Sequence, residues 1–436
     1  MIKQTFFLLL MLFCSLTVKA QLYFPPNTTT TWESIPITDL NWCQDKIDDL
    51  YNFLETNNTK AFIVLKDGKL VLEHYFNDHT ATSNWYWASA GKTLTAFMVG
   101  IAQQENYLDI SEVTANYLGN GWTSCTSAQE NAITIQHQLT MTSGLNDEVT
   151  DPYCTTADCL HYLADAGTRW AYHNAPYTLL DQVLENATGQ SLNNYTTQKL
   201  KNITGMDGAY LQQGYNTVFF STARSMARFG LLILNKGNWN GTPILTDTNY
   251  YNQMVSTSQN LNESYGYLWW LNGKNSYMIP QSQMIFSGSM TPDAPNDMIA
   301  ALGKNGQFIN VIPSQQLVWI RMGEAPDNSL VSFTLNNEIW RYINQLDCGS
   351  LSTENFQANT FSFTISPNPS TDTMLISSNK STNTVYTITN LLGQTIQEGI
   401  FSGKTHLINI KQLPQGIYHI TLQNEKYKQS LKIIKE

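Results

Sequence analysis

The chain has 436 residues, too many for one ordinary compact core and enough for two or three domains. With 42% hydrophobic and 12% aromatic residues, its composition is typical of an ordered globular protein. The formal net charge is −10, and the excess of acidic residues lies before residue 361, because residues 361–436 hold seven Lys and only four Asp or Glu. An acidic main body argues against nucleic acid or an anionic membrane surface as a partner.

The first twenty residues have the pattern of a secretory signal peptide. "MIKQ" carries a positive charge, "TFFLLLMLFCSLTV" is apolar, and "VKA" before Gln21 offers small residues for cleavage. A retained membrane anchor is the alternative, but the apolar run is shorter than the ~20 residues that a bilayer requires. We therefore expect an exported protein, secreted or at the cell surface, with no membrane span in the mature chain.

Export permits disulfides, and five cysteines remain beyond residue 20: Cys43, Cys125, Cys154, Cys159 and Cys348. Cys154 and Cys159 are close enough in sequence to close a small loop, and Cys43 with Cys348 could tie together the two ends of the main domain. An odd number leaves one thiol unpaired unless it bonds another chain. Zinc ligation is the competing interpretation, but no cysteine pair has a second pair at matching spacing.

Strand patterns occur early and late in the first 350 residues. The segment 60–76 alternates around Asp67-Gly68, which predicts a β-hairpin. Segments 264–273 and 307–323 predict further strands, the second turning at Pro313-Ser314, and 330–346 predicts an amphipathic helix. Helices and loops dominate between them. The pattern favours an α+β fold, an α-β sandwich in which an antiparallel sheet is flanked by helices and carries an inserted helical subdomain.

The composition changes near residue 350, where the chain becomes rich in Ser, Thr and Asn. Beyond it, short alternating runs are separated by turn residues at regular intervals, which predicts a small all-β, Ig-like sandwich. The expected division is a signal peptide at 1–20, a main domain at 21–350, a linker at 351–361 and a β-domain at 362–436.

Ser89 stands three residues before Lys92 in "SNWYWASAGKTLTAFMVG", where a helix is expected to begin. A serine hydroxyl needs a base to act as a nucleophile, and positions i and i+3 share one helical face, so Lys92 can reach it. Free N–H groups at a helix N-terminus also face developing negative charge. The alternative is a capping serine followed by a surface lysine, and this pair alone does not separate the two.

Two later segments strengthen the catalytic interpretation. "RWAYHNAPY" contains Tyr172-His173-Asn174, and "ALGKNGQFINVIP" contains Lys304-Asn305-Gly306 at the entry to a strand. In this order, residues 40–346 resemble the serine β-lactamase and penicillin-binding protein superfamily. The likeness is greatest to the class C β-lactamase-like branch, with its esterases, D-aminopeptidases, carboxypeptidases and nylon-oligomer hydrolases.

The resemblance implies an acyl-enzyme mechanism. Ser89 attacks an ester or amide carbonyl, Lys92 holds or accepts its proton, and Tyr172 acts as partner base and then as acid toward the leaving group. Asn174 hydrogen-bonds Lys92 and the substrate, and the backbone N–H groups of Ser89 and Gln307 form the oxyanion hole. Whether Lys92 or Tyr172 is the base stays open.

The third motif departs from the pattern of the family. Lys304 retains the positive charge that could meet a substrate carboxylate, and Gly306 retains room for a substrate backbone. Asn305 replaces the usual hydroxyl by an amide, which argues against β-lactam or D-Ala-D-Ala specificity more than against catalysis. Lys92 and Lys304 are the cations expected to favour the Tyr172 phenolate.

The last 76 residues resemble the C-terminal sorting domain of type IX secretion cargo. The resemblance rests on "SPNPS", "NLLGQTIQEG", "LPQGIYHITL" and the terminal "LKIIKE". It implies transport across the inner and then the outer membrane, with the type IX secretion machinery as partner. A carbohydrate-binding or adhesive sandwich is the alternative, although the segment shows no aromatic stripe suited to sugars.

The sequence therefore predicts a secreted serine hydrolase that acts on a small ester, amide or peptide through Ser89. The alternative is a catalytically silent relative that binds cell-wall fragments or a protein partner. No metal or organic cofactor is implied by any motif.

Overall fold

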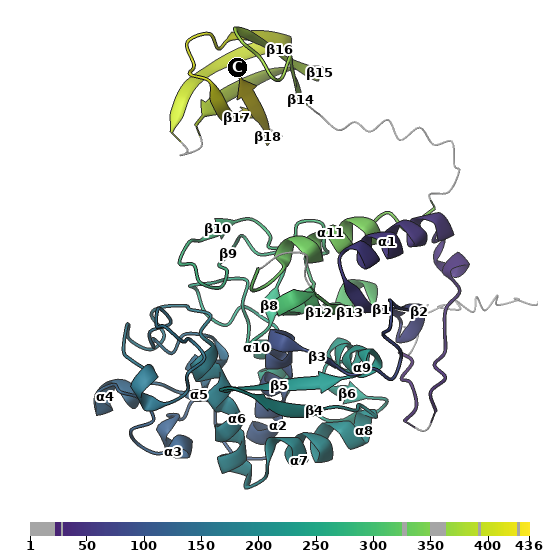
Figure 1. Cartoon of the computed structure of the whole chain (residues 1–436), viewed down its shortest axis with the longest axis vertical. Coiled ribbons are helices and arrows are strands. Elements are labelled where there is room, and N and C mark those ends of the chain that lie inside the picture. Colours follow the sequence, from purple (N-terminus) through teal and green to yellow (C-terminus); the bar gives the residue numbers. More distant parts are fainter. Residues whose placement is uncertain (1–21, 28, 325–328, 349–362, 391–393, 425–427) are drawn as a thin grey trace, which may run out of the picture. The chain divides into compact units, whose positions relative to one another are not determined.

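A computed structural model describes residues 22–27, 29–324, 329–348, 363–390, 394–424 and 428–436 (Figure 1). The chain divides into two compact units, residues 1–349 and residues 350–436, which are described separately. The predicted signal peptide and the predicted linker lie outside the described residues.

The first unit is built on an antiparallel six-stranded sheet with the order β2-β1-β13-β12-β11-β8. Its strands come from both ends of the unit, as the sequence predicts: β1 (Thr59–Lys66), β2 (Lys69–Tyr75), β8 (Trp270–Leu271), β11 (Ile299–Gly303), β12 (Gln307–Ile312) and β13 (Leu317–Gly323). Every residue of β11, β12 and β13 is buried, which requires a cover on both faces of the sheet.

Helices provide that cover, so the predicted α+β class is confirmed. α9 (Ala223–Leu234) packs against β1, β12 and β13, while α1 (Gln44–Thr56) and α11 (Phe333–Ile343) lie on the other side (Figure 1). Gly230 permits the close approach of α9, because a Cβ atom there would lie 2.6 Å from Cγ1 of Val318.

The region between the early and late strands is the predicted helical insertion, with short strands among its helices. The helices are α2 (Lys92–Gln104), α3 (Ala115–Leu118), α4 (Ser127–Glu130), α5 (Ile135–Leu139), α6 (Asn174–Thr188), α7 (Leu192–Thr196), α8 (Asn202–Thr204) and α10 (Thr248–Met254). The strands are β3 (Trp85–Tyr86), β4 (Ala209–Gln213), β5 (Asn216–Ser221), β6 (Asn238–Trp239), β7 (Thr242–Pro243), β9 (Ser276–Tyr277) and β10 (Phe286–Ser287).

The two predicted hairpins are confirmed, but the strand predicted over 264–273 is mostly wrong. Asp67 and Gly68 both have positive φ, which suits the two-residue turn between β1 and β2. In 264–273 only Trp270–Leu271 join the sheet. Leu268 has a φ of 60°, so the extended backbone is interrupted there, although residues 264–272 are all buried.

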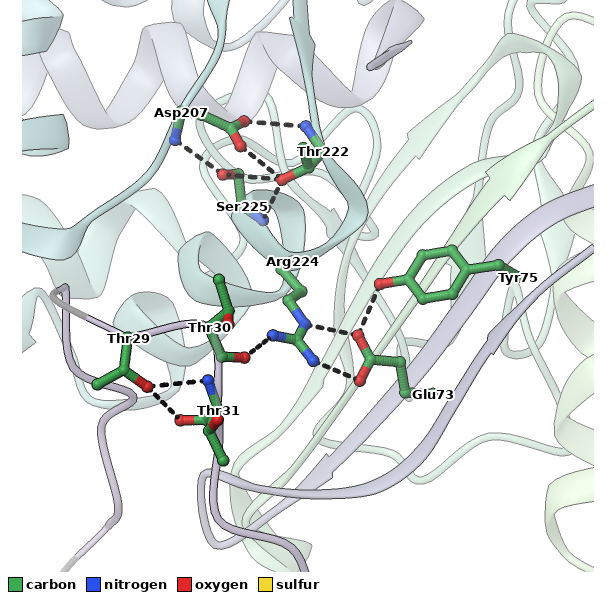
Figure 2. A network of polar contacts seen from close by, with 9 residues as sticks. All are labelled: Thr29, Thr30, Thr31, Glu73, Tyr75, Asp207, Thr222, Arg224 and Ser225. Atoms are coloured by element: carbon green, nitrogen blue, oxygen red, sulfur yellow. Dashed lines mark hydrogen bonds and ion pairs between the residues drawn. The ribbon is translucent and has the colours of Figure 1, made fainter. Parts of the chain in front are cut away.

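Arg224, near the start of α9, connects the chain at Thr30 to strand β2 (Figure 2). Its guanidinium donates to Glu73 of β2 through Nε at 2.6 Å and Nη2 at 2.7 Å, and through Nη1 to the carbonyl of Thr30. Tyr75 donates to the same carboxylate at 2.6 Å. A bidentate arginine–carboxylate pair of this kind fixes both partners.

Two disulfides join the cysteine pairs suggested by the sequence. Cys43–Cys348 closes 305 residues between the N-cap of α1 and the end of the unit, whereas Cys154–Cys159 closes five. Cys125 is the unpaired thiol within the described residues.

We expect loss of the Cys43–Cys348 bond to lower the free energy of unfolding by about 2–4 kcal/mol, because closing a long loop removes much entropy from the unfolded chain. Urea titration of a Cys43→Ser, Cys348→Ser double variant tests this. The matched Cys154→Ser, Cys159→Ser variant should lose less, since its loop is short. Equal losses in the two variants would contradict the loop-length argument.

The second unit is all-β, consistent with the predicted small sandwich. It contains β14 (Phe363–Ser366), β15 (Thr373–Thr389), β16 (Thr395–Asn409), β17 (Gly416–Gln423) and β18 (Lys428–Lys435). Alternate residues of these strands form its own core, including Met374, Ile376, Ile388, Ile420 and Leu422. Among the described residues of both units, no helix has the length and apolar character needed to cross a bilayer.

Candidate active site

Ser89 lies in a tight turn that leads directly into α2. The turn, η2 (Ala88–Gly91), is a 3₁₀ helix, so Ser89 precedes the α-helix whose first residue is Lys92. Trp87 anchors the turn, because it is fully buried and donates from Nε1 to Ser221 Oγ at 2.8 Å. Ala88 has a φ of 46°, a strained value for a residue with a side chain, and such strain is often found at functional sites.

Lys92 links Ser89 to α6. Its side chain is only 4% exposed, and Nζ donates to Ser89 Oγ at 3.2 Å and to Asn174 Oδ1 at 2.8 Å. The ring of Tyr177 covers the ammonium, with Nζ 3.9 Å from the ring centroid. The structure thus brings together Ser89, Lys92 and Asn174, three of the residues that the resemblance implicates.

Burial lowers the pKa of Lys92 to about 7, and the negative charge of Asp181 opposes this shift. The cause is the loss of water around the ammonium, which disfavours its charged form. A large fraction of the Lys92 side chains is therefore neutral near pH 7, and a neutral amine can accept the proton of Ser89.

Tyr172 borders the same group of side chains. Its ring stacks on Trp270 at 5.7 Å between centroids and lies 5.4 Å from Nζ of Lys92. Burial raises the pKa of Tyr172, and hydrogen bonding with the Ser89 side chain opposes this only in part. The direction is opposite to the predicted stabilisation of a phenolate, because desolvation outweighs the influence of the neighbouring groups.

The Lys304-Asn305-Gly306 segment forms the turn between β11 and β12. Asn305 and Gly306 have φ values of 62° and 73°, and the Asn305 side chain donates from Nδ2 to Tyr86 Oη at 2.7 Å. Strand β11 packs against the turn of Ser89 at Gly303, where a Cβ atom would lie 2.6 Å from the carbonyl oxygen of Trp87 and 3.1 Å from the Ser89 nitrogen. Glycine at position 303 is therefore required for this approach.

Arg321 of β13 forms hydrogen bonds with that turn from the protein interior. It is fully buried and donates from Nη1 to the carbonyls of Asn305 at 3.1 Å and Gly306 at 2.8 Å. A Cβ atom on Gly306 would lie 2.3 Å from this guanidinium nitrogen. The space at Gly306 is thus filled by Arg321, whereas the sequence suggested room for a substrate.

Gln307, the predicted second oxyanion donor, is fully buried in β12. Its side chain donates to the carbonyl of Gly323 at 2.5 Å and accepts from the N–H of Gly323 at 3.1 Å. These bonds join β12 to β13 and give the Gln307 side chain a structural role.

A cavity of about 290 Å³ opens over Ser89. Its lining includes Ser89, Lys92, Asn174 and Lys304, together with Tyr86, Ala88, Tyr153, Tyr177, Gln213, Asn216, Thr217 and Val218. No Asp or Glu lines this cavity among the described residues. Asn305, Gly306 and Gln307, which the sequence also placed at the site, are not part of this lining.

Sequence reasoning missed three side chains around the site. Tyr177 and Asp181 follow Asn174 on α6 at spacings of three and seven residues, which places all three on one helical face. Arg321 stands alone as a charged residue in the apolar run "LVWIRMG". A charge inside a fully buried strand, or an acid on the apolar face of a helix, is the signal that marks such residues.

Comparison with known proteins agrees with this geometry. A profile described as β-lactamase matches residues 58–328, and one described as a secretion system C-terminal sorting domain matches residues 364–436. An uncharacterized protein of Alkalihalophilus pseudofirmus is 22% identical over 300 residues, covering 60% of this chain and 82% of its own.

Two solved structures show the same fold as the first unit. One is described as a putative 6-aminohexanoate-dimer hydrolase from Bacillus anthracis, with a TM-score of 0.56 and 19% identity over 74% of this chain and 91% of its own. The other is described as a family VIII carboxylesterase, with a TM-score of 0.54 and 13% identity over 69% of this chain and 97% of its own.

The second unit is accordingly a secretion sorting domain, which indicates export from the cell or display on its surface. The β-lactamase profile covers more than half of the residues, and its span includes Ser89, Lys92, Tyr172 and Lys304. The chain therefore belongs to the β-lactamase family of serine hydrolases.

Proposed function

We propose that this protein is an exported hydrolase that cleaves a small ester or amide through an acyl-enzyme on Ser89. The observation that carries the proposal is the position of Lys92. Its buried amine contacts the Ser89 hydroxyl and Asn174 at the wall of a cavity, and its pKa is lowered to about 7.

In the proposed mechanism, neutral Lys92 accepts the hydroxyl proton as Ser89 Oγ bonds to the substrate carbonyl carbon. The tetrahedral intermediate then collapses, the bond to the leaving alcohol or amine breaks, and that group receives a proton. Tyr172 supplies it, since its raised pKa favours the protonated phenol, and is reprotonated from Lys92. Water hydrolyses the acyl-enzyme by the reverse sequence of proton transfers.

Two backbone N–H groups are proposed to stabilise the oxyanion, each contributing about 3–4 kcal/mol in related chemistry. One belongs to Ser89. For the other, the approach of Gly303 to the Ser89 nitrogen supports the next residue, Lys304, over Gln307.

The cavity supports a small substrate that carries a carboxylate near the scissile bond. It has no acidic lining among the described residues, and its lining includes Lys304, an exposed lysine, as well as Ser89. Within the described part of the chain, that ammonium makes no hydrogen bond or ion pair. The descriptions of the two similar structures, a putative 6-aminohexanoate-dimer hydrolase and a carboxylesterase, agree with hydrolysis of a small amide or ester.

The sorting domain supports delivery by the type IX secretion machinery to the outside of the cell. Substrates would then be extracellular small molecules or cell-wall peptides. This location agrees with the disulfides, which persist in oxidising surroundings.

Covalent labelling tests the proposal directly. A fluorophosphonate probe should add its mass to the Ser89 peptide of the purified protein, and Ser89→Ala should remove the adduct. A panel of p-nitrophenyl esters, anilides and D-amino-acid peptides, with and without a carboxylate, then defines the substrate. A folded protein that neither takes the label nor turns over any member of the panel would instead favour a silent binding protein.

A further inference from the structure

A buried acid, Asp181, lies on the face of α6 that meets Lys92. Asp181 follows Asn174 by seven residues, two helical turns, so both side chains project from one face. Thr95 likewise follows Lys92 by three residues on α2. Asn174 accepts from Lys92 at 2.8 Å, and Asp181 Oδ1 accepts from Thr95 Oγ1 at 3.4 Å. The two contacts join α2 to α6, about one turn apart on α2 and two turns apart on α6.

Asp181 is buried, yet within the described part of the chain one oxygen of its carboxyl group lacks a hydrogen-bond partner. The residue is only 7% exposed, and Oδ2 is buried without a hydrogen-bond partner among the described residues. A carboxylate in such a place is destabilising unless a nearby positive charge compensates it. Lys92 is the positive charge that favours its ionised form, although less strongly than the hydroxyls of Thr217 and Thr95 do.

Six side chains from four elements interact electrostatically or by hydrogen bonds with this carboxyl group: Lys92 and Thr95 of α2, Tyr177 and Glu185 of α6, Tyr210 of β4 and Thr217 of β5. Burial raises the pKa of Asp181 to about 7; Thr217, Thr95 and Lys92 favour the ionised form, and Glu185 opposes it. Burial also raises the pKa of Tyr177 and of Tyr210, which stay neutral phenols.

Asp181 also lines a second cavity, of about 490 Å³, together with Glu185 and Thr217. Thr217 lines this cavity and the Ser89 cavity as well. Asp181 thus lines a polar opening whose lining, apart from Thr217, differs from that of the Ser89 cavity.

Resting on the proposed function, we propose that Asp181 is a positioning residue that acts through Lys92. Its negative charge favours the ammonium form of Lys92 and so sets the pH at which Lys92 releases its proton and Ser89 becomes reactive. Removal of this negative charge makes the buried ammonium easier to deprotonate. The pH at which the reaction switches on should therefore fall.

The test compares the whole protein with its Asp181→Asn variant by two measurements. The first is the ¹³Cε shift of Lys92 against pH in lysine-labelled protein, assigned by its absence in Lys92→Met. The second is the rate of fluorophosphonate labelling of Ser89 against pH. Both midpoints should move down by about one pH unit in Asp181→Asn.

Glu130→Gln is the matched control, because Glu130 is a carboxylate that is only 3% exposed and is bonded to Gly121 and Thr123 instead of to α2. Its midpoints should equal those of the wild type. Unmoved midpoints in folded Asp181→Asn would overturn the inference even if the labelling rate falls, since a merely structural role changes the rate alone.

The two measurements also separate this inference from the proposed function. Absence of label in the wild type would refute the proposed function, while the lysine titration would still decide the role of Asp181. If Asp181→Asn does not fold, Thr95→Val removes the hydroxyl that favours the ionised acid and keeps the shape of the side chain. It should shift the lysine midpoint downward, and an unchanged midpoint there counts against the inference.

Discussion

Replacement of Lys92 by methionine is expected to lower kcat/KM by about 10²–10⁴-fold, the usual contribution of a general base. Stability should change little, because Asp181, whose pKa burial raises to about 7, can take up a proton when its positive neighbour is lost. Methionine has a similar length and removes a buried amine whose pKa burial has lowered, so the cost of desolvation disappears. Against this gain, Asn174 Oδ1 loses its donor, which costs about 1–3 kcal/mol. Ester turnover and urea denaturation of the same preparation give both numbers.

Two variants define the limits of this measurement. Ser89→Ala gives the floor of activity, because it removes the attacking oxygen. Lys201→Met removes a half-buried lysine that bonds the carbonyl of Gly208, away from the cavity lining, and should leave the labelling rate unchanged. Near-normal turnover in a folded Lys92→Met variant would mean that another group accepts the proton of Ser89, and Tyr172 would then be the candidate base.

The sequence predicted the contacts that depend on short spacing. Ser89 and Lys92 are three residues apart at the start of a helix, so their contact follows from local geometry once the helix forms. The paired hairpins β1–β2 and β12–β13 follow equally from turn residues and alternation. The contact between Lys92 and Asn174 spans 82 residues, and only the resemblance to a known family placed it.

Features that depend on packing between distant segments were not predicted. The burial that lowers the pKa of Lys92 and raises that of Tyr172 comes from α6, β11 and the Trp270 region closing around them. Spacing supports a cationic neighbourhood for Tyr172, but desolvation decides the direction of its shift. The positive φ at Leu268 likewise ends a strand whose composition favours one.

Replacement of Arg321 by methionine is expected to destabilise the first unit by about 3–5 kcal/mol, since a buried donor group is removed and its acceptors stay behind. The guanidinium donates to the hydroxyl of Thr59 and to four backbone carbonyls, those of Asn57, Asn305, Gly306 and Glu324. Methionine fills the volume but donates to none of them. Urea denaturation measures the loss.

The same change should also slow the labelling of Ser89, because Arg321 fixes the turn that carries Lys304, which lines the cavity over the nucleophile. A displacement of about 1 Å at a reacting centre can lower the rate by about 10²-fold.

Arg341→Met is the matched control. Arg341 is exposed on α11 and pairs with Glu338, so both stability and labelling should stay close to wild type. Arg321→Lys should fall between the two, since an ammonium reaches fewer of the acceptors than the planar fork. A stability loss without slower labelling would limit Arg321 to holding strands β12 and β13, and unchanged stability would contradict the hydrogen-bond assignment itself.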